Sequence, residues 1–339
     1  MASYKDIQRE TGLSLATISK YFNGGTLREA NRTAIQASVE ALDFRPNAFA
    51  AGLRRQRSRI VGVLLPALDN EFHLHIIAGV EEALRSEGMS VIVASSPRAE
   101  DDAVGLLLSR MVDGIIAVPS AHDVEPLEEA TRRIPVVMID WEARLDADGV
   151  FLDNHRAGAI AARHLLDHGH RRLGLIGGDR SVSTMRLRAD GFIAETETVG
   201  AAGDAVSVAV TEGPLSVETG HSSAVRLLTA RPRPTALFCS NSELTLGALI
   251  AINESGLRLG DDISVIGFDL VDVAQTTIPR LTIIEQPTRA IAAHAAQLLG
   301  RRLSQDRVQD ENRVVELLPP RLLPGGSVSR LHFRPHAGA

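Results

Sequence analysis

The sequence has a single cysteine, Cys239, and only two lysines in 339 residues, and aromatic residues make up 4% of the chain. One cysteine cannot form an intrachain disulfide or a metal site built from several thiolates, and it suits a reducing compartment. Charged residues are spread through the first 30 positions, and no apolar run reaches membrane-spanning length. We therefore expect neither a signal peptide nor a transmembrane helix, and a soluble, cytoplasmic protein.

The composition is otherwise that of a globular protein, with 44% hydrophobic and 23% charged residues. These fractions exclude a disordered or collagen-like chain. A length of 339 residues exceeds that of one small module and predicts more than one domain.

The net charge of −6 is unevenly distributed along the chain. Residues 1–60 hold ten Lys or Arg and five Asp or Glu, a net charge of +5. The remaining 26 basic and 37 acidic side chains leave a net charge of −11. A small basic head on an acidic body indicates that the head alone binds a polyanion.

The head has the pattern of a helix-turn-helix. A short helix is predicted over 4–10, Gly12 suits a tight turn, and Ser14 is a good N-cap for a second helix over 15–22. A third helix is predicted over roughly 29–42. A generic three-helix bundle whose charges are merely solvated is the alternative.

The second helix of a helix-turn-helix faces the major groove with its N-terminal residues. The side chains placed to reach base edges are Leu15, Ala16 and Lys20, and the hydroxyls suited to phosphate oxygens are those of Ser14, Thr17 and Ser19. Ile7, Leu13 and Ile18 are predicted to form the core of the head.

Strands and helices alternate after a basic linker at residues 46–59. Continuous apolar runs predict strands buried on both faces, as in parallel sheets covered by helices. These runs are residues 60–66, 89–95, 114–119, 135–140, 149–154, 172–178, 205–210, 235–240 and 263–269, with a helix near 71–87. So many strands predict an α/β fold with two doubly wound parallel-sheet lobes, approximately 60–153 and 154–280, and a chain that crosses back after 281.

Motifs for an enzyme or a cofactor are missing. The sequence has no GxGxxG, no GxxxxGK[ST] and no GxSxG, so we predict neither an enzyme nor a cofactor. His164 and His168 are spaced to share one helix face but lack a third ligand, so we predict a solvated or capping role and no metal site. Cys239 lies in an apolar run and is predicted to be buried rather than a nucleophile.

The sequence resembles members of the LacI/GalR family of transcriptional regulators in several motifs and in their order along the chain. They include GLSLATISKYFNGG (12–25), EALDFRPNAFAAGLRR (40–55), PTALFCSNSELTLGAL (234–249) and DDISVIGFD (261–269), and the resemblance covers nearly the whole chain. It implies a DNA-binding head at 1–45, a hinge at 46–59 and a periplasmic-binding-protein-like sensor at 60–339. It also implies a homodimeric repressor of a near-palindromic DNA operator, with a small sugar-like effector between the two lobes.

The resemblance assigns functional residues at matching positions of this sequence. In the hinge it places Leu53 as an apolar wedge between base steps, with Asn47 and Arg54 among the DNA-contacting residues. In the sensor it places a set of effector-binding residues, which are Asp140, Arg188, Asn241 and Asp269, with Phe72 and Trp141 for stacking and Thr184 and Gln286 as further members. Each effector-binding residue has a local capping or pairing role as its alternative, and the alternative for Leu53 is an ordinary linker residue.

Two other functions are compatible with a bilobal α/β body. A solute-binding receptor for transport uses the same architecture but has no use for a basic head. An enzyme requires a recognisable nucleophile, metal or acid/base pair. Residues after 323 contain no apolar heptads, so a dimer is predicted rather than a coiled-coil tetramer.

Overall fold

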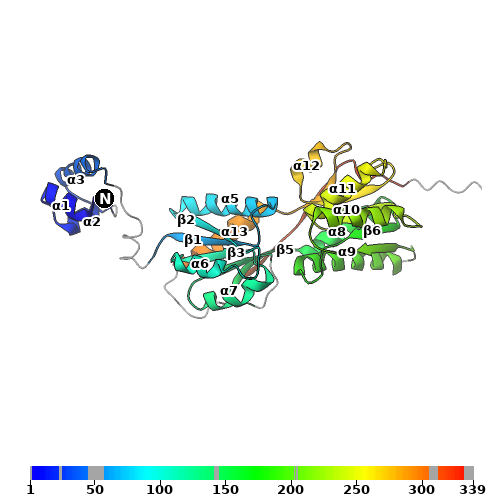
Figure 1. Cartoon of the computed structure of the whole chain (residues 1–339), viewed down its shortest axis with the longest axis horizontal. Helices are drawn as coiled ribbons and strands as arrows, with labels where there is room; N and C mark the ends of the chain where they lie inside the picture. Colours follow the sequence, from blue (N-terminus) through cyan, green and yellow to red (C-terminus); the bar gives the residue numbers. More distant parts are fainter. Residues whose placement is uncertain are drawn as a thin grey trace, which may run out of the picture. The chain divides into compact units, whose positions relative to one another are not determined.

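A computed structural model of the chain describes residues 2–22, 25–44, 57–140, 145–201, 203, 205–304 and 312–331. The chain forms two compact units, residues 1–59 and 60–339 (Figure 1). In the described residues, no helix is both long and apolar enough to cross a bilayer.

The first unit contains α1 (Tyr4–Thr11), α2 (Leu15–Phe22) and α3 (Glu29–Ala41). Ile7, Ile18 and Ile35 are fully buried at its centre, and Leu13 packs against them. The backbone N–H of Thr17 donates to Oγ of Ser14 at 3.2 Å, so the predicted cap of the second helix is present. These contacts confirm the predicted helices and core of the head.

A buried polar contact joins the first and third helices of the head. Ser38 interrupts the apolar face of α3 and is 3% exposed. Its hydroxyl donates to Oε2 of Glu10 on α1 at 2.5 Å. Because Glu10 accepts this bond, the buried hydroxyl of α3 is satisfied at the helix–helix contact.

The second unit is built on two six-stranded sheets, one in each lobe. The first sheet has the order β11-β5-β4-β3-β1-β2. Its strands are β1 (Ile60–Leu65), β2 (Ser90–Ser95), β3 (Gly114–Ala117), β4 (Val136–Ile139), β5 (Asp148–Leu152) and β11 (Val315–Leu318). All of its pairings are parallel, as the apolar runs predicted.

The second sheet repeats this order as β12-β10-β9-β8-β6-β7. Its strands are β6 (Arg172–Ile176), β7 (Ser207–Thr211), β8 (Ala236–Cys239), β9 (Ser264–Phe268), β10 (Thr282–Glu285) and β12 (Arg321–Leu323). Only the pairing of β12 with β10 is antiparallel among the described strands. The two lobes therefore share one doubly wound topology.

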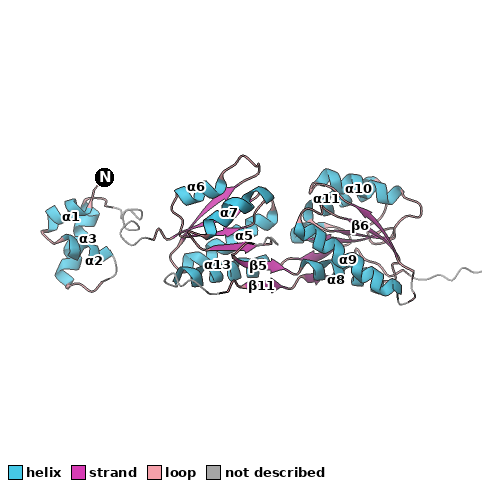
Figure 2. Cartoon of the chain, turned by 90° about the horizontal axis from the view of Figure 1, so that it is seen from below, coloured by secondary structure: helices cyan, strands magenta, loops and turns pink. Residues whose placement is uncertain are grey.

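Helices cover both faces of each sheet (Figure 2). In the first lobe, α5 (Glu71–Ser86) and α13 (Thr288–Ser304) pack on one face, and α6 (Ala103–Ser109) and α7 (Val124–Thr131) on the other. In the second lobe, α8 (Asn154–Asp167) and α9 (Ser183–Ala201) pack on one face, and α10 (Val217–Thr229) and α11 (Ser242–Glu254) on the other. The short α12 (Val271–Thr276) follows β9.

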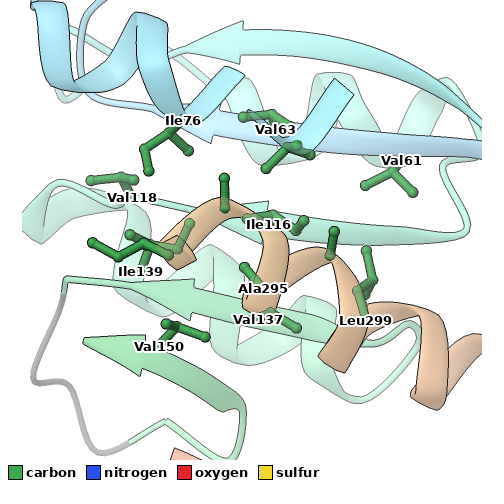
Figure 3. Packing of buried hydrophobic residues seen from close by; sticks show 14 of the residues in the cluster. Val61, Val63, Ile76, Ile116, Val118, Val137, Ile139, Val150, Ala295 and Leu299 are labelled. Atoms are coloured by element: carbon green, nitrogen blue, oxygen red, sulfur yellow. The ribbon is translucent and has the colours of Figure 1, made fainter. Parts of the chain in front are cut away.

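The core of the first lobe shows why its strands are apolar throughout. Val63, Ile116 and Val137 of the sheet pack in one cluster with Ile76 of α5 and Ala295 of α13 (Figure 3). All five side chains are 1% exposed or less. Helices on one face of the sheet bury these side chains, and helices on the other face bury the side chains that alternate with them along each strand. Neither face of these strands is therefore exposed to solvent, so neither needs polar residues.

The chain passes between the lobes three times, at 153, after β10 and between β11 and β12. The return predicted after 281 lies beyond residue 285 in the structure, since Thr282–Glu285 still pairs with β9. The last passage, with the strands Val315–Leu318 and Arg321–Leu323, was not predicted. These strands are too short for a recognisable pattern, and Val315 and Leu317 are exposed at 50% and 61%.

Candidate functional site

Asp140 and Asp269 each follow directly after a buried strand, β4 and β9 respectively. Both have left-handed backbone conformation, with φ of 56° and 53°. The backbone N–H of Asp269 still donates to the carbonyl of Ile284 at 2.8 Å, and that of Asp140 donates to Val150 at 3.3 Å. The sheets therefore fix both aspartates at the carboxyl ends of their strands.

Arg188 of α9 is a buried arginine, 3% exposed. Its Nε donates to Oδ1 of Asn154 at 2.7 Å, and its Nη1 donates to the carbonyl of Ser240 at 2.8 Å. The central carbon of the guanidinium lies 3.6 Å from the centroid of the Phe268 ring. Two hydrogen bonds and stacking on an aromatic ring fix the plane of the guanidinium.

Asn154, the first residue of α8, links the two lobes through its side-chain amide. Its Nδ2 donates to Oδ1 of Asp140 in the first lobe at 3.2 Å, while its Oδ1 accepts from Arg188 in the second. Oδ2 of Asp140 also lies 4.0 Å from Nη2 of Arg188. Because both ends of the amide are engaged, its orientation is determined by its partners.

Gln286 directly follows β10, the strand beside β9, and holds the carboxylate of Asp269. Its backbone N–H donates to Oδ1 of Asp269 at 3.1 Å, and its Nε2 donates to Oδ2 at 2.8 Å. Burial raises the pKa of Asp269 to about 6, against the lowering effects of the Gln286 hydrogen bond and the charge of Arg188. Burial also lowers the pKa of Arg188, and the charges of Asp140 and Asp269 oppose that shift. We call Asp140, Asn154, Arg188, Asp269 and Gln286 the polar cluster.

A second set of contacts links the lobes through Glu243 of α11. Nδ2 of Asn70 donates to Oε1 of Glu243 at 2.7 Å, and Nδ2 of Asn241 donates to Oε2 of Glu243. Both asparagines are also N-caps: Asn70 accepts from the N–H of Phe72, and Asn241 accepts from that of Leu244. The capping amides that begin α5 and α11 therefore meet on one carboxylate.

Two buried polar atoms near these groups have no hydrogen-bond partner among the residues that the structure describes. They are Oε1 of Gln286 and Nδ1 of His73. Burial lowers the pKa of His73, against the charges of Glu243, Asp69 and Asp140. Buried polar atoms are normally paired, so each of these two atoms has an unused capacity for one hydrogen bond.

The structure brings together four of the predicted effector residues, Asp140, Arg188, Asp269 and Gln286. Asn241 instead belongs to the contacts around Glu243. Phe72 is half-buried in the first turn of α5, and Thr184 is buried on α9 one turn before Arg188. Trp141 lies outside the described residues.

Sequence reasoning missed several residues of the site, which are Asn70, His73, Asn154, Ser240, Glu243 and Phe268. Phe268 lies inside the quoted motif 261–269 and directly precedes Asp269, whereas Asn154 is the last residue of the predicted strand at 149–154. Asn70 and Glu243 carry a weaker signal, an N-cap and a first-turn carboxylate at two helix starts. No spacing in the sequence indicates that these two residues meet.

The second helix of the head presents its predicted DNA-contacting side to solvent. Leu15 is 37% exposed, Ala16 and Lys20 are exposed, and Ile18 on the opposite side is fully buried. The hydroxyls of Ser14 and Thr17 lie 2.9 Å apart at the start of this helix, and Ser19 is half-buried. Asn47, Leu53 and Arg54 lie outside the described residues.

Comparison with known proteins gives the family. A family described as a periplasmic binding protein-like domain matches residues 162–328. The HTH-type transcriptional repressor PurR of Photobacterium profundum is 31% identical over 330 residues, which cover 94% of this chain and 96% of that protein. The chain belongs to the LacI/GalR family of transcriptional regulators. This confirms the resemblance in its motifs.

Solved structures of the LacI/GalR family share the fold. The lac repressor dimer bound to operator and the anti-inducer ONPF has a TM-score of 0.84 at 26% identity, covering 97% of this chain and 99% of that one. A LacI-family regulator from Enterococcus faecium with bound ribose has a TM-score of 0.70 at 25% identity, covering 80% and 100%.

This LacI/GalR chain is a ligand-responsive transcriptional repressor. An alignment over 94% of the chain includes most of the basic head as well as both lobes. A solute-binding receptor has no counterpart of that head, so the alignment favours the repressor over the receptor.

Proposed function

We propose that this repressor binds a near-palindromic operator as a homodimer and that its effector is a sugar or sugar-like molecule held by the polar cluster. The observation that carries the proposal is the buried guanidinium of Arg188, fixed by Asn154, Ser240 and Phe268 in the field of two aspartates. A charged group buried in this way requires polar partners.

The donors and acceptors of the polar cluster suit vicinal hydroxyls. The carboxylates of Asp140 and Asp269 accept hydrogen bonds from hydroxyls. Arg188 uses one N–H on Asn154 and one on Ser240, which leaves three of its five N–H donors for hydroxyl oxygens. Oε1 of Gln286 is an additional acceptor. A ring bearing several hydroxyls satisfies this mixture, whereas an apolar ligand does not.

Further effector contacts are proposed for residues outside the polar cluster. Phe72 and Trp141 offer aromatic faces for the apolar side of a sugar ring, and Thr184 and Asn241 offer a hydroxyl and an amide. The ribose complex of the Enterococcus faecium regulator supports a sugar as the ligand class.

A thermal-shift and calorimetric screen tests the effector class. Pentoses, hexoses, sugar acids, nucleosides and nucleobases are added to the full chain, and a cleft ligand raises the melting temperature by mass action. We expect a sugar or sugar acid to stabilise the protein and Asp269→Ala to abolish that shift. Stabilisation by a nucleobase alone, or an undiminished sugar response in Asp269→Ala, overturns the proposal.

On the DNA side, we propose that Leu15, Ala16 and Lys20 reach base edges while Ser14, Thr17 and Ser19 contact phosphates. In the hinge, we propose that Leu53 enters a base step of the minor groove, with Asn47 and Arg54 contacting the backbone beside it. Lys20 is the one long donor among the three base-reading residues, so it is assigned the hydrogen bond to a base.

Gel-shift titration with operator DNA tests these assignments. Leu53→Ala and Lys20→Ala are expected to weaken operator binding while leaving the effector-induced thermal shift unchanged. Lys5→Ala is the matched control, because Lys5 is the other lysine and is exposed on α1. Equal losses for Lys5→Ala and Lys20→Ala contradict a base-reading role for Lys20, and unchanged binding by Leu53→Ala contradicts the wedge.

A further inference from the structure

Two half-buried histidines lie side by side at the end of α8 opposite Asn154. The ring centroids of His164 and His168 are 4.3 Å apart, with an interplanar angle of 43°. Residues four apart share one face of a helix, and such pairs place two imidazoles on a single metal ion.

The hydrogen bonding of His168 prepares its ring as a ligand. Its Nδ1 lies 2.7 Å from the carbonyl oxygen of His164, and an oxygen acceptor at this distance requires the proton on Nδ1. The lone pair is then on Nε2. Metal-binding histidines commonly donate their second ring nitrogen to a backbone carbonyl in this way, which fixes both tautomer and orientation.

The surroundings favour a bound cation. The carboxylate of Asp167 acts on His164 as a neighbouring negative charge. The site also lies in the last turn of α8, where helix carbonyls attract positive charge.

The nearby His170 is not a ligand. Its Nδ1 contacts Oγ1 of Thr235 at 2.9 Å, and its Nε2 contacts the carbonyl of Ser329 at 3.1 Å, so both ring nitrogens are occupied. In the described part of the chain, no group of three or more His, Cys, Asp or Glu side chains is arranged to hold a metal ion. A site here therefore has two protein ligands.

We propose that His164 and His168 bind one divalent transition-metal ion of the Ni²⁺, Cu²⁺ and Zn²⁺ class, with water at the remaining coordination positions. Imidazole nitrogen suits these ions, and Cu²⁺ binds most tightly among them. This site is separate from the polar cluster and does not depend on the proposed effector.

Metal titration of the full chain tests the site. Because His332 and His336 follow in the C-terminal sequence, every protein carries His332→Ala and His336→Ala, which removes histidines that also bind such ions. In this background, calorimetry with Zn²⁺ is expected to show one equivalent bound. With Cu²⁺, electron paramagnetic resonance is expected to show hyperfine coupling to two imidazole nitrogens.

Substitution of either ligand identifies the residues responsible. His164→Ala, His164→Gln and His168→Ala are each expected to weaken Zn²⁺ binding by about tenfold or more. His155→Ala is the matched control, because His155 is an exposed histidine on the same helix, and it is expected to leave binding unchanged. The proposal is overturned if the background protein binds no Zn²⁺, or if the His164 and His168 variants bind it as tightly as the His155 variant.

Discussion

Asp140 and Asp269 occupy the same position in the two lobes of the repressor. Each follows the fourth strand of its lobe and has left-handed backbone, and the charges of both act on Arg188. The two sheets have the same strand order, so the topology that places one aspartate at the carboxyl edge of its sheet also places the other. The charge of one carboxylate from each lobe therefore acts on an arginine from α9.

This arrangement gives the proposed effector a way to act on both lobes. A ligand that contacts Asp140 and Asp269 together has a different affinity for each relative position of the lobes. Such a difference is what couples an effector site to DNA binding, and a coupling free energy of about 1–3 kcal/mol is typical.

Arg188→Lys is expected to weaken binding of the stabilising sugar by about 100-fold, because lysine lacks the planar fork that bonds Asn154 and Ser240 and stacks on Phe268. Calorimetric titration measures the loss. Operator binding in the absence of effector is expected to remain, since the substitution leaves the head unchanged.

The control is Arg180→Lys, which alters a more exposed arginine paired with Asp190. Its sugar affinity is expected to match that of the unsubstituted repressor. If Arg180→Lys loses as much affinity as Arg188→Lys, or if Arg188→Lys binds the sugar normally, the role of Arg188 in the effector site is wrong.

Asp269→Asn is expected to stabilise the effector-free protein near neutral pH. The carboxyl has a pKa of about 6 in the folded state and 3.8 when unperturbed. The folded state therefore holds this proton to higher pH, and stability falls as pH rises from about 4 to about 6. The amide cannot ionise, so the stabilisation is expected to grow from near zero below pH 4 to about 1–3 kcal/mol at pH 7.

Urea denaturation across that pH range measures the difference. Asp262→Asn provides a comparison of opposite sign, because its hydrogen bonds with Arg258 lower the pKa of Asp262. That variant is expected to lose stability above pH 4. A constant stability difference between Asp269→Asn and the unsubstituted protein at all pH values contradicts the raised pKa.

Local patterns in the sequence predicted the head and the central strands because each depends on neighbouring residues. Ser14 caps the helix that it precedes, and the apolar run at Ile60–Leu65 requires helices on both of its faces. Aspartates at the ends of β4 and β9 were assigned for the same reason, because they directly follow recognisable strands.

Contacts between segments far apart in the sequence could not be predicted in this way. Asn70 and Glu243 meet across 173 residues, and Asn154 meets Arg188 across 34. Each of these side chains has an ordinary local role at a helix terminus or on a helix face. The Asn70–Glu243 contact depends on how the two lobes are packed, and the Asn154–Arg188 contact depends on how α8 packs against α9. Neither helical nor strand periodicity encodes such packing.

The ion pair between Asp148 and Arg302 holds the helix that returns to the first lobe. Nε and Nη2 of Arg302 donate to the two carboxylate oxygens at 2.8 Å each, and the N–H of Val314 donates to Oδ1. The side chain of Asp148 is 3% exposed. Arg302→Met is expected to destabilise the protein by about 3 kcal/mol, because it leaves a buried carboxylate without its charged partner.

Urea denaturation of Arg302→Met, Asp148→Asn and the double variant gives the coupling free energy between the two residues. Arg85→Met is the control, since its pair with Glu81 is exposed and exposed pairs contribute about 0.5 kcal/mol. Equal destabilisation by Arg302→Met and Arg85→Met contradicts a structural role for the buried pair.

Gly158 and Gly191 allow α8 and α9 to pack in direct backbone contact. A Cβ at Gly158 would lie 1.9 Å from the carbonyl oxygen of Arg188, and a Cβ at Gly191 would lie 1.9 Å from that of His155. Gly158→Ala must therefore push α9 away. It is expected to cost about 1–3 kcal/mol of stability and to weaken sugar binding, because the backbone that carries Arg188 moves.

Gly200→Ala is the matched control on α9, because a Cβ there meets no atom within 4 Å. Alanine is favoured over glycine in a helix by about 1 kcal/mol, so this variant is expected to be as stable as the unsubstituted protein or slightly more so. Thermal denaturation and calorimetry of the two variants separate close packing from helix propensity. A Gly158→Ala protein that keeps both stability and sugar affinity shows that α9 does not need this close approach to position Arg188.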